Sequence, residues 1–252
     1  MLLVIAAWGN PITISRMENR QSIYAFFIYA IAACIGLILV VSATWADVES
    51  ASYGFDRRAS APFNGLRCPI LMTVSEGRAI TVTVKNTTDK PLSPSVKTEI
   101  STSILPVETL ESIRLSPGES KRLEWIVGAD NIDLDSFIFF KVLVFASYPV
   151  PDRETTCGIL ILNLPLSGRV LTIVAILLSV LGMGYGLFTL KKSDPAVGPV
   201  ARAARPFTFL TVVMVAGLFF SFMGWWIQNI VVLVFAALTI VVTINSLIFK
   251  AE

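Results

Sequence analysis

The chain has 252 residues, of which 54% are hydrophobic and 15% charged, and its mean hydropathy is +0.73. A soluble domain carries about 25% charged residues, so this composition is not that of an ordinary cytosolic protein. Because the chain has no histidine, His-ligated metal and haem sites, Ser-His and Cys-His catalysis and histidine pH switches are excluded. A net charge of +2 gives no electrostatic basis for nucleic-acid binding, and we expect no such partner.

Four apolar runs without a charged residue organise the chain, at 23–46, 170–190, 206–224 and 230–249. Each has roughly 19–24 residues, enough to cross about 30 Å of hydrocarbon as a helix that rises about 1.5 Å per residue. We therefore expect an α-helical membrane protein with four transmembrane helices. The first covers 23–46, the second covers 167–190, and the third and fourth form a hairpin over 206–249.

The segments between these helices divide into basic and mixed ones. Lys and Arg gather in the N-terminal segment 1–22, the loop 191–205 and the tail 250–252. Cytoplasmic segments carry the excess of Lys and Arg, so we expect a multi-pass plasma-membrane protein with both termini cytoplasmic and residues 47–166 extracytoplasmic. Aromatic rings that prefer the membrane interface then lie at its outer side: Trp45, Trp225 and Trp226.

Two features near the N-terminus leave alternatives open. The first apolar run has a passable signal-peptidase site at 44–46, but its apolar core exceeds the usual 7–15 residues of a signal peptide. We therefore favour an uncleaved signal anchor. Residues 1–16 precede a natural start at Met17, so they are either an over-extended gene start or a short ordered arm.

The outer block has a hydrophobic period of two, which is typical of half-buried strands. In 79–86, Ile80, Val82 and Val84 alternate with polar residues, and 122–127 alternates in the same way. Further strands are expected at 70–75, 96–100, 112–115, 137–146 and 157–164. About seven short strands separated by turn residues predict an all-β, immunoglobulin-like sandwich.

Two of the three cysteines, Cys68 and Cys157, bracket this outer block. In an oxidising compartment they are expected to form a disulfide, the alternative being two unpaired thiols. Closing a loop of roughly 90 residues stabilises a domain by about 4–5 kcal/mol through chain entropy. Cys34 lies inside the first apolar run, where a thiol behaves as a small apolar residue.

Two stretches of the outer block resemble a known kind of module. The strand RAITVTVKNTT begins at Arg78, and the turn and strand LSPGESKRLEW begins at Leu115. Together they resemble bacterial immunoglobulin-like modules of the CARDB type, over about 60 residues and none of the apolar runs. The resemblance implies the sandwich fold alone. Such modules resemble adhesion or assembly domains and usually lack catalytic residues.

Small residues at a spacing of four allow helix backbones to approach closely in lipid. The second apolar run carries Gly182, Gly184 and Gly186, and the first carries Ala32 and Gly36. We predict that these residues form helix-packing faces. No charged residue lies inside any run, which argues against a transport pathway.

The expected strand at 137–145 is apolar on both faces, whereas an antiparallel sheet normally keeps one face polar. Its second face, formed by Phe139, Leu143 and Phe145, is interrupted only by Lys141. Such a face needs a cover. We favour a partner subunit, and the bilayer surface or an internal lid from the 100–110 connection are the alternatives.

No nucleophile–base pair or metal-ligand set is visible, so we expect neither an enzyme nor a cofactor. Asp130, Asp133 and Asp135 offer carboxylates but lack the spacing of an EF-hand. We predict a bacterial, non-catalytic accessory or assembly subunit of a larger membrane complex, whose partners are other membrane subunits and the lipid bilayer. The alternative is a free-standing extracytoplasmic protein that binds a ligand or a polymer.

Overall fold

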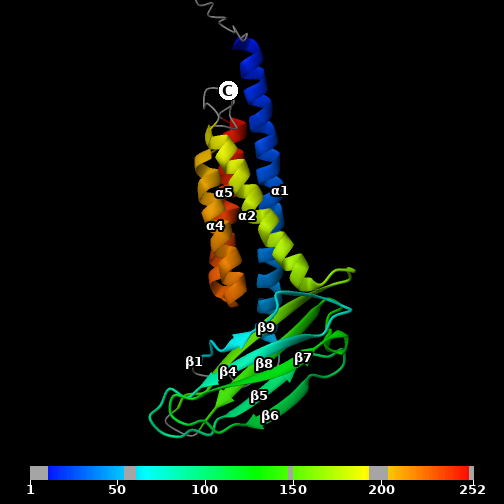
Figure 1. Ribbon diagram of the computed structural model, residues 1–252, viewed down its shortest axis with the longest axis vertical. Helices are drawn as coiled ribbons and strands as arrows, with labels where there is room; N and C mark the ends of the chain where they lie inside the picture. Colours follow the sequence, from blue (N-terminus) through cyan, green and yellow to red (C-terminus); the bar gives the residue numbers. More distant parts are fainter. Residues whose placement is uncertain (1–10, 54–60, 147–149, 193–203, 250–252) are drawn as a thin grey trace, which may run out of the picture. The chain divides into compact units, whose positions relative to one another are not determined.

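The computed structural model describes residues 11–53, 61–146, 150–192 and 204–249 (Figure 1). Its four long helices are each long and apolar enough to cross a membrane. They are α1 (Pro11–Ser52), α2 (Gly168–Lys192), α4 (Ala204–Met223) and α5 (Trp226–Phe249). The predicted helices at 167–190 and 206–249 agree closely with α2, α4 and α5, while α1 is longer than predicted at both ends.

The chain divides into two compact units. The helical unit comprises 1–38, 175–218 and 231–252, and the second unit comprises 39–174 and 219–230. The end of α1, the start of α2 and the turn between α4 and α5 therefore belong to the unit that contains the strands. Residues 1–10, the tail 250–252 and most of the predicted basic loop at 191–205 lie outside the described residues.

In the helical unit, α1 and α2 pack closely through small residues. A Cβ added at Gly182 would overlap the side chain of Ala32, and one added at Gly186 would press on Tyr29. A Cβ at Gly36 would overlap Ser179 of α2. Gly182 and Ala32, both predicted packing residues, thus meet each other, while Gly36 and Gly186 approach other residues of the facing helix. Gly184 is the exception, because a Cβ added there would meet nothing within 4 Å.

A buried tyrosine joins α1 to α4 in the same unit. The Tyr29 hydroxyl donates a hydrogen bond to the backbone oxygen of Phe207 at 2.8 Å and lies 3.0 Å from the hydroxyl of Thr211. The rings of Tyr29 and Phe207 stack, with centroids 4.7 Å apart. An apolar stretch of sequence gives no sign of this partner, so the contact is not predictable from the hydrophobic pattern.

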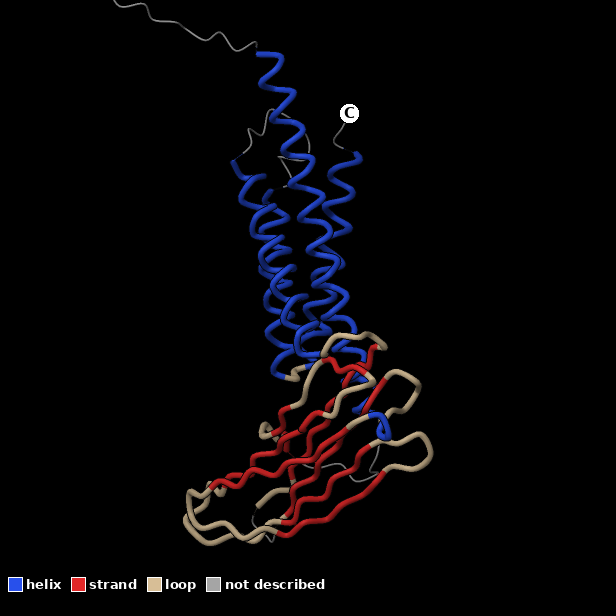
Figure 2. The backbone as a smooth tube through the Cα atoms, turned by 45° about the vertical axis from the view of Figure 1, so that its right-hand side comes forward, coloured by secondary structure: helices blue, strands red, loops and turns tan. Residues whose placement is uncertain are grey.

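The second unit contains two β-sheets (Figure 2). In the larger sheet the strand order is β1-β9-β8-β5-β6, with β3 also paired to β9, and in the smaller it is β2-β4-β7. The strands are β1 (Ala61–Pro62), β2 (Leu66–Arg67), β3 (Leu71–Thr73), β4 (Arg78–Lys85), β5 (Ser95–Ile100), β6 (Val107–Ser112), β7 (Ser120–Val127), β8 (Phe137–Phe145) and β9 (Arg153–Leu162). Both sheets contribute to one hydrophobic core, with Ile80 and Val82 from β4 and Ile138 and Phe140 from β8.

The strand predicted at 112–115 is wrong, because β6 occupies Val107–Ser112 instead and forms a hairpin with β5. All six residues of β6 are exposed, so the strand has no alternation of buried and exposed positions from which to predict it. The predictions for β4, β5, β7 and β8 agree with the structure to within two residues. Each of those strands contributes buried side chains to the core, and their apolar residues give the sequence signal.

The α1–α2 contact yields a matched pair of substitutions. Gly186→Leu should lower the free energy of unfolding by about 1–3 kcal/mol, the usual cost of overpacking, because α1 must move away from α2. Gly184→Leu on the same helix should have little effect, since the space around it is open. Thermal unfolding of the full chain in detergent measures both. Equal losses of stability would contradict the close approach of the two helices at Gly186.

Candidate functional site

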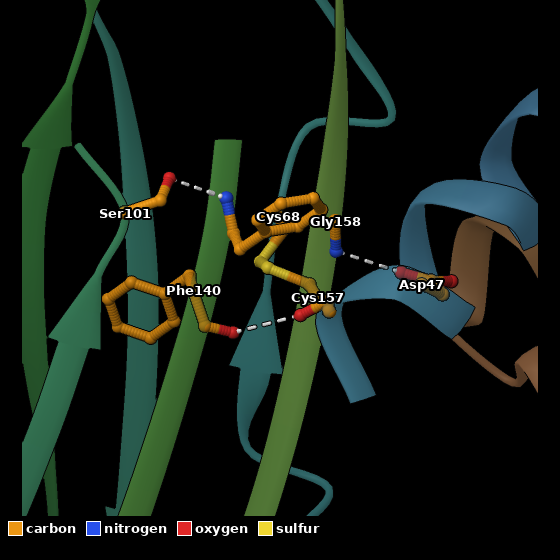
Figure 3. The surroundings of a disulfide bond; sticks show 8 residues. Asp47, Cys68, Ser101, Phe140, Cys157 and Gly158 are labelled. Carbon is orange, nitrogen blue, oxygen red and sulfur yellow. Dashed lines mark hydrogen bonds between the residues drawn. A yellow bond between two sulfur atoms is a disulfide. The ribbon is translucent and has the colours of Figure 1, made fainter. Parts of the chain in front are cut away.

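The last turns of α1 pack on the outer face of the larger sheet (Figure 3). The side chain of Asp47, 5% exposed, accepts a hydrogen bond of 3.1 Å from the backbone N–H of Gly158 on β9. Ser50, fully buried, donates to the backbone oxygen of Phe140 at 3.5 Å. A Cβ at Gly158 would overlap backbone atoms of Ala46, so only glycine permits this approach.

The disulfide lies directly beside this contact. Cys68 and Cys157 are bonded, as predicted, with their Cα atoms 6.5 Å apart. Cys157 precedes Gly158 on β9 and faces the core, while Gly158 faces α1 (Figure 3). The bond therefore ties the segment after β2 to the part of β9 that carries the helix.

The predicted partner face of β8 is not open in this structure. Phe139 is 2% exposed and Leu143 3% exposed, and Phe145 is half-buried. The ring of Tyr53, just beyond the end of α1, packs on Phe139 with centroids 5.1 Å apart. The sequence allowed a subunit, the bilayer or the 100–110 connection as the cover. That connection is instead the exposed β5–β6 hairpin, and residues at the end of α1 lie on this face.

Lys141, the charged residue that interrupts this face, is also buried. Its Nζ donates to the backbone oxygen of Tyr53 at 3.5 Å, immediately after the last residue of α1. A cation at the C-terminus of a helix is stabilised by the helix dipole and by the unpaired carbonyls there. Lys141 therefore helps to hold the end of α1 on the sheet.

Glu99 of β5 lies between Lys141 of β8 and Glu108 of β6 in the strand register. It is buried, and its Oε2 has no hydrogen-bond partner among the described residues. Lys97 Nζ lies 2.9 Å from a carboxylate oxygen of Glu108 and 4.0 Å from one of Glu99. The pKa of Glu99 is raised to about 7, chiefly by burial and also by the neighbouring Glu108 carboxylate, while Lys97 and Lys141 oppose the shift.

A second carboxylate holds the start of α2. Glu76 Oε2 accepts a hydrogen bond of 2.9 Å from the backbone N–H of Gly168, the first residue of that helix. A Cβ at Gly168 would overlap the backbone of Leu71 and Met72 in β3. The end of α1 and the start of α2 are thus each tied to the strand-containing unit by a carboxylate that accepts from the backbone N–H of a glycine.

A cavity of about 760 Å³ opens beside the end of α1, and all of its lining residues belong to the second unit. Its wall includes residues of both charges and two tryptophans: Asp47, Arg67, Lys141, Glu154, Trp225 and Trp226. The mixture of charge and aromatic surface suits a ligand that carries both a cationic and an anionic group.

The acidic loop before β8 is a turn. The Asp133 carboxylate accepts a hydrogen bond of 2.8 Å from the backbone N–H of Leu134, which with Asp135 has a positive φ. Asp130 lies in a short 3-10 helix, η1 (Ala129–Asn131). Within residues 11–53, 61–146, 150–192 and 204–249, no group of three or more Cys, Asp or Glu side chains is placed to hold a metal ion.

No protein-family model and no curated protein matches the chain. Solved structures match at low similarity. The CARDB domain of a Pyrococcus furiosus protein, in complex with di-metal ions, has a TM-score of 0.30 and 15% identity, over 39% of this chain and 90% of that one. A Paenibacillus cycloisomaltooligosaccharide glucanotransferase has a TM-score of 0.30 and 14% identity, over 40% of this chain and 14% of that one. A Listeria innocua β-glucosidase has a TM-score of 0.28 and 18% identity, over 43% and 16%.

This chain therefore spans less than a fifth of either enzyme. The CARDB match agrees with the resemblance seen in the sequence, at a similarity too low to establish a family. None of these likenesses carries an argument about function.

The disulfide is expected to support much of the stability of the strand-containing unit. Replacing both Cys68 and Cys157 by Ser should lower its free energy of unfolding by about 4–5 kcal/mol, because the bond closes a loop between residues 89 apart. Fluorescence of Trp125, which packs near Phe140, reports the unfolding. Cys34→Ser, at the unpaired cysteine of α1, is the control. A double variant as stable as this control would refute the prediction.

The buried Glu99 predicts how stability depends on pH. Its pKa in the folded protein, about 7, exceeds its ordinary value of 4.5, so the folded state holds the proton more tightly than the unfolded state. Stability is then fully present below about pH 4.5 and falls as the pH rises through about 7. Glu99→Gln should make this fall markedly smaller in thermal unfolding between pH 5 and about 8. Glu111→Gln, at an exposed position of β6, should keep the wild-type slope, and an unchanged slope in Glu99→Gln would contradict the assignment.

Proposed function

We propose that the protein is a non-catalytic accessory or assembly subunit of a larger plasma-membrane complex. Its four apolar helices cross the bilayer, and its strand-containing unit is an extracytoplasmic, immunoglobulin-like sandwich. The surface that meets the partner is the β5–β6 hairpin, residues 95–112. The observation that carries the proposal is the exposure of apolar side chains on this hairpin, which a partner would cover.

The division of the chain supports the membrane part of the proposal. The sequence predicts that the end of the first helix, the start of the second and the turn between the third and fourth face outward. These segments, 39–52, 168–174 and 219–230, all belong to the unit that contains the strands. Many large apolar side chains of the four helices are exposed in the isolated chain, as a lipid environment requires.

The tip of the hairpin is a defined turn that presents two apolar side chains. The hydroxyl of Thr102 donates to the backbone oxygen of Leu105 at 2.6 Å and accepts from the N–H groups of Ile104 and Leu105 at 3.4 and 3.3 Å. Ile104 is 87% exposed and Leu105 73% exposed. Adjacent exposed apolar side chains on an ordered turn are typical of an interaction surface.

Strand β6 extends this surface along the edge of the larger sheet. Its Val107 and Leu110 side chains are also exposed. An edge strand offers backbone N–H and C=O groups to which a partner strand can pair. Glu108 and Glu111 lie on either side of Leu110 and form ion pairs with Lys97 and Lys121. Charged side chains on an edge strand disfavour indiscriminate pairing, so the edge suits a selected partner.

The hairpin gives a direct test. The double substitution Ile104→Asp and Leu105→Asp should detach the protein from its complex, because a charge buried at an apolar contact is costly. The measurement is native-gel migration of the full chain, solubilised from its own membranes in mild detergent. The wild type should migrate well above its own mass of 27.5 kDa, and the double variant should migrate as a single chain.

Ile126→Asp is the matched control, because Ile126 is 77% exposed but lies on β7 of the other sheet. This variant should remain in the complex. A wild-type protein that migrates alone in several detergents would contradict the proposal and favour the free-standing binding protein. An Ile126→Asp variant that dissociates as fully as the double variant would show that the hairpin is not the contact.

A further inference from the structure

The cavity beside the end of α1 is lined by three segments that are far apart in the sequence. The end of α1 contributes Asp47, and the strands contribute Arg67 and Glu154. The turn between α4 and α5 contributes Trp225, and the start of α5 contributes Trp226. All of these residues lie in the second unit. The cavity thus lies beside helix ends that belong to this unit, and its volume of about 760 Å³ exceeds that of a small buried void.

Arg67 is an exposed cation on this wall with a weak partner. Its guanidinium lies 3.8 Å from the sulfur of Met223, and a thioether is a poor hydrogen-bond acceptor. Among the described residues, no Asp or Glu forms an ion pair with it. A guanidinium binds a phosphate strongly because its planar N–H groups match two phosphate oxygens. Arg67 therefore suits the anionic part of a ligand.

Asp47 is a buried carboxylate that also lines the cavity. One of its oxygens accepts from Gly158, and the other is directed away from β9 (Figure 3). In the described part of the chain no Lys or Arg forms an ion pair with Asp47. A buried carboxylate without a cation is costly, and a ligand ammonium would supply the missing charge and hydrogen bond. The tryptophan rings in the same wall favour an organic cation as well.

We propose that this cavity binds a phosphoethanolamine group carried by a membrane phospholipid. The phosphodiester lies at Arg67, and the primary ammonium donates to Asp47. A choline group has no N–H to donate, and a glycerol headgroup has no cation, so neither satisfies Asp47. Exposed apolar side chains at the cavity rim, Phe222 and Ile227, offer a surface to the acyl chains. The inference rests on the membrane insertion in the proposed function, but not on the partner.

Native mass spectrometry of the full chain in detergent tests this binding. The probes are phosphatidylethanolamine, phosphatidylcholine and phosphatidylglycerol with identical acyl chains. The wild type should retain phosphatidylethanolamine roughly tenfold more than phosphatidylcholine, the effect of one hydrogen bond to a charged group. Asp47→Asn, which keeps an acceptor for Gly158, should remove this preference. Arg67→Ala should weaken retention of all three lipids, because each carries the phosphodiester.

Arg122→Ala is the control for Arg67, since Arg122 is exposed on β7 and does not line the cavity. It should bind as the wild type does. Equal retention of the three lipids by the wild type, or an unchanged preference in Asp47→Asn, would overturn the inference. Competition by soluble glycerophosphoethanolamine at the concentration of the lipid would overturn the lipid as the source of the group.

The outcome is separable from that of the proposed function. The Ile104→Asp and Leu105→Asp variant, altered only at the hairpin, should keep the lipid preference even when it leaves the complex. Release of the wild type from membranes by alkaline carbonate would instead contradict membrane insertion, on which both proposals depend. A preference for phosphatidylethanolamine in a protein that migrates alone would leave the lipid site standing and remove the partner.

Discussion

The arrangement of the strand-containing unit depends on the close approach of α1 to β9 at Gly158. The backbone of Ala46 occupies the space that any other side chain would fill, and Asp47 satisfies the N–H of Gly158. A buried backbone N–H needs a hydrogen-bond acceptor. The Asp47 carboxylate supplies one for Gly158, whose N–H the helix shields from water. The disulfide at Cys157 fixes the neighbouring residue of β9 to the segment after β2, which holds the strand under the helix.

This contact also explains the unusual pattern of β8. Phe139 is apolar on a face that an antiparallel sheet normally leaves to water, because Tyr53 at the end of α1 lies on it. Lys141 is tolerated there because its ammonium group reaches the carbonyl of Tyr53. Strand β8 is apolar on both faces because residues at the end of α1 lie on its second face. This face is therefore no evidence for a partner subunit. The exposed hairpin tip at Ile104 and Leu105 has no such cover within the described residues.

The sequence predicts those features that rest on a repeated pattern or on the spacing of a few distinctive residues. The four helices follow from the length of the uncharged runs, β4 and β7 from alternation, and the Cys68–Cys157 bond from two cysteines that bracket the strands. The hydrophobic pattern does not predict the extension of α1 beyond residue 46, because Asp47 and Glu49 suggest the start of a polar domain. A signal was present, since Ala43, Ala46 and Ser50 continue a buried helical face past the predicted end. Strand β6 has no burial pattern at all and needs the pairing with β5 to be recognised.

Glycines and carboxylates whose packing and charge are already satisfied within the chain are not available to bind a partner or a ligand. Gly182 and Gly186 pack against α1, so these two residues of the predicted helix-packing face are used within the chain. Two carboxylates, on Asp47 and Glu76, hold the helix ends on the strands through backbone N–H groups. The Glu76 carboxylate also forms an ion pair with Arg78, with N and O atoms 3.6 Å apart. Asp47 forms no ion pair among the described residues, and it lines a cavity. That difference in charge compensation between two similar contacts is the reason to seek a ligand ammonium group at one and not at the other.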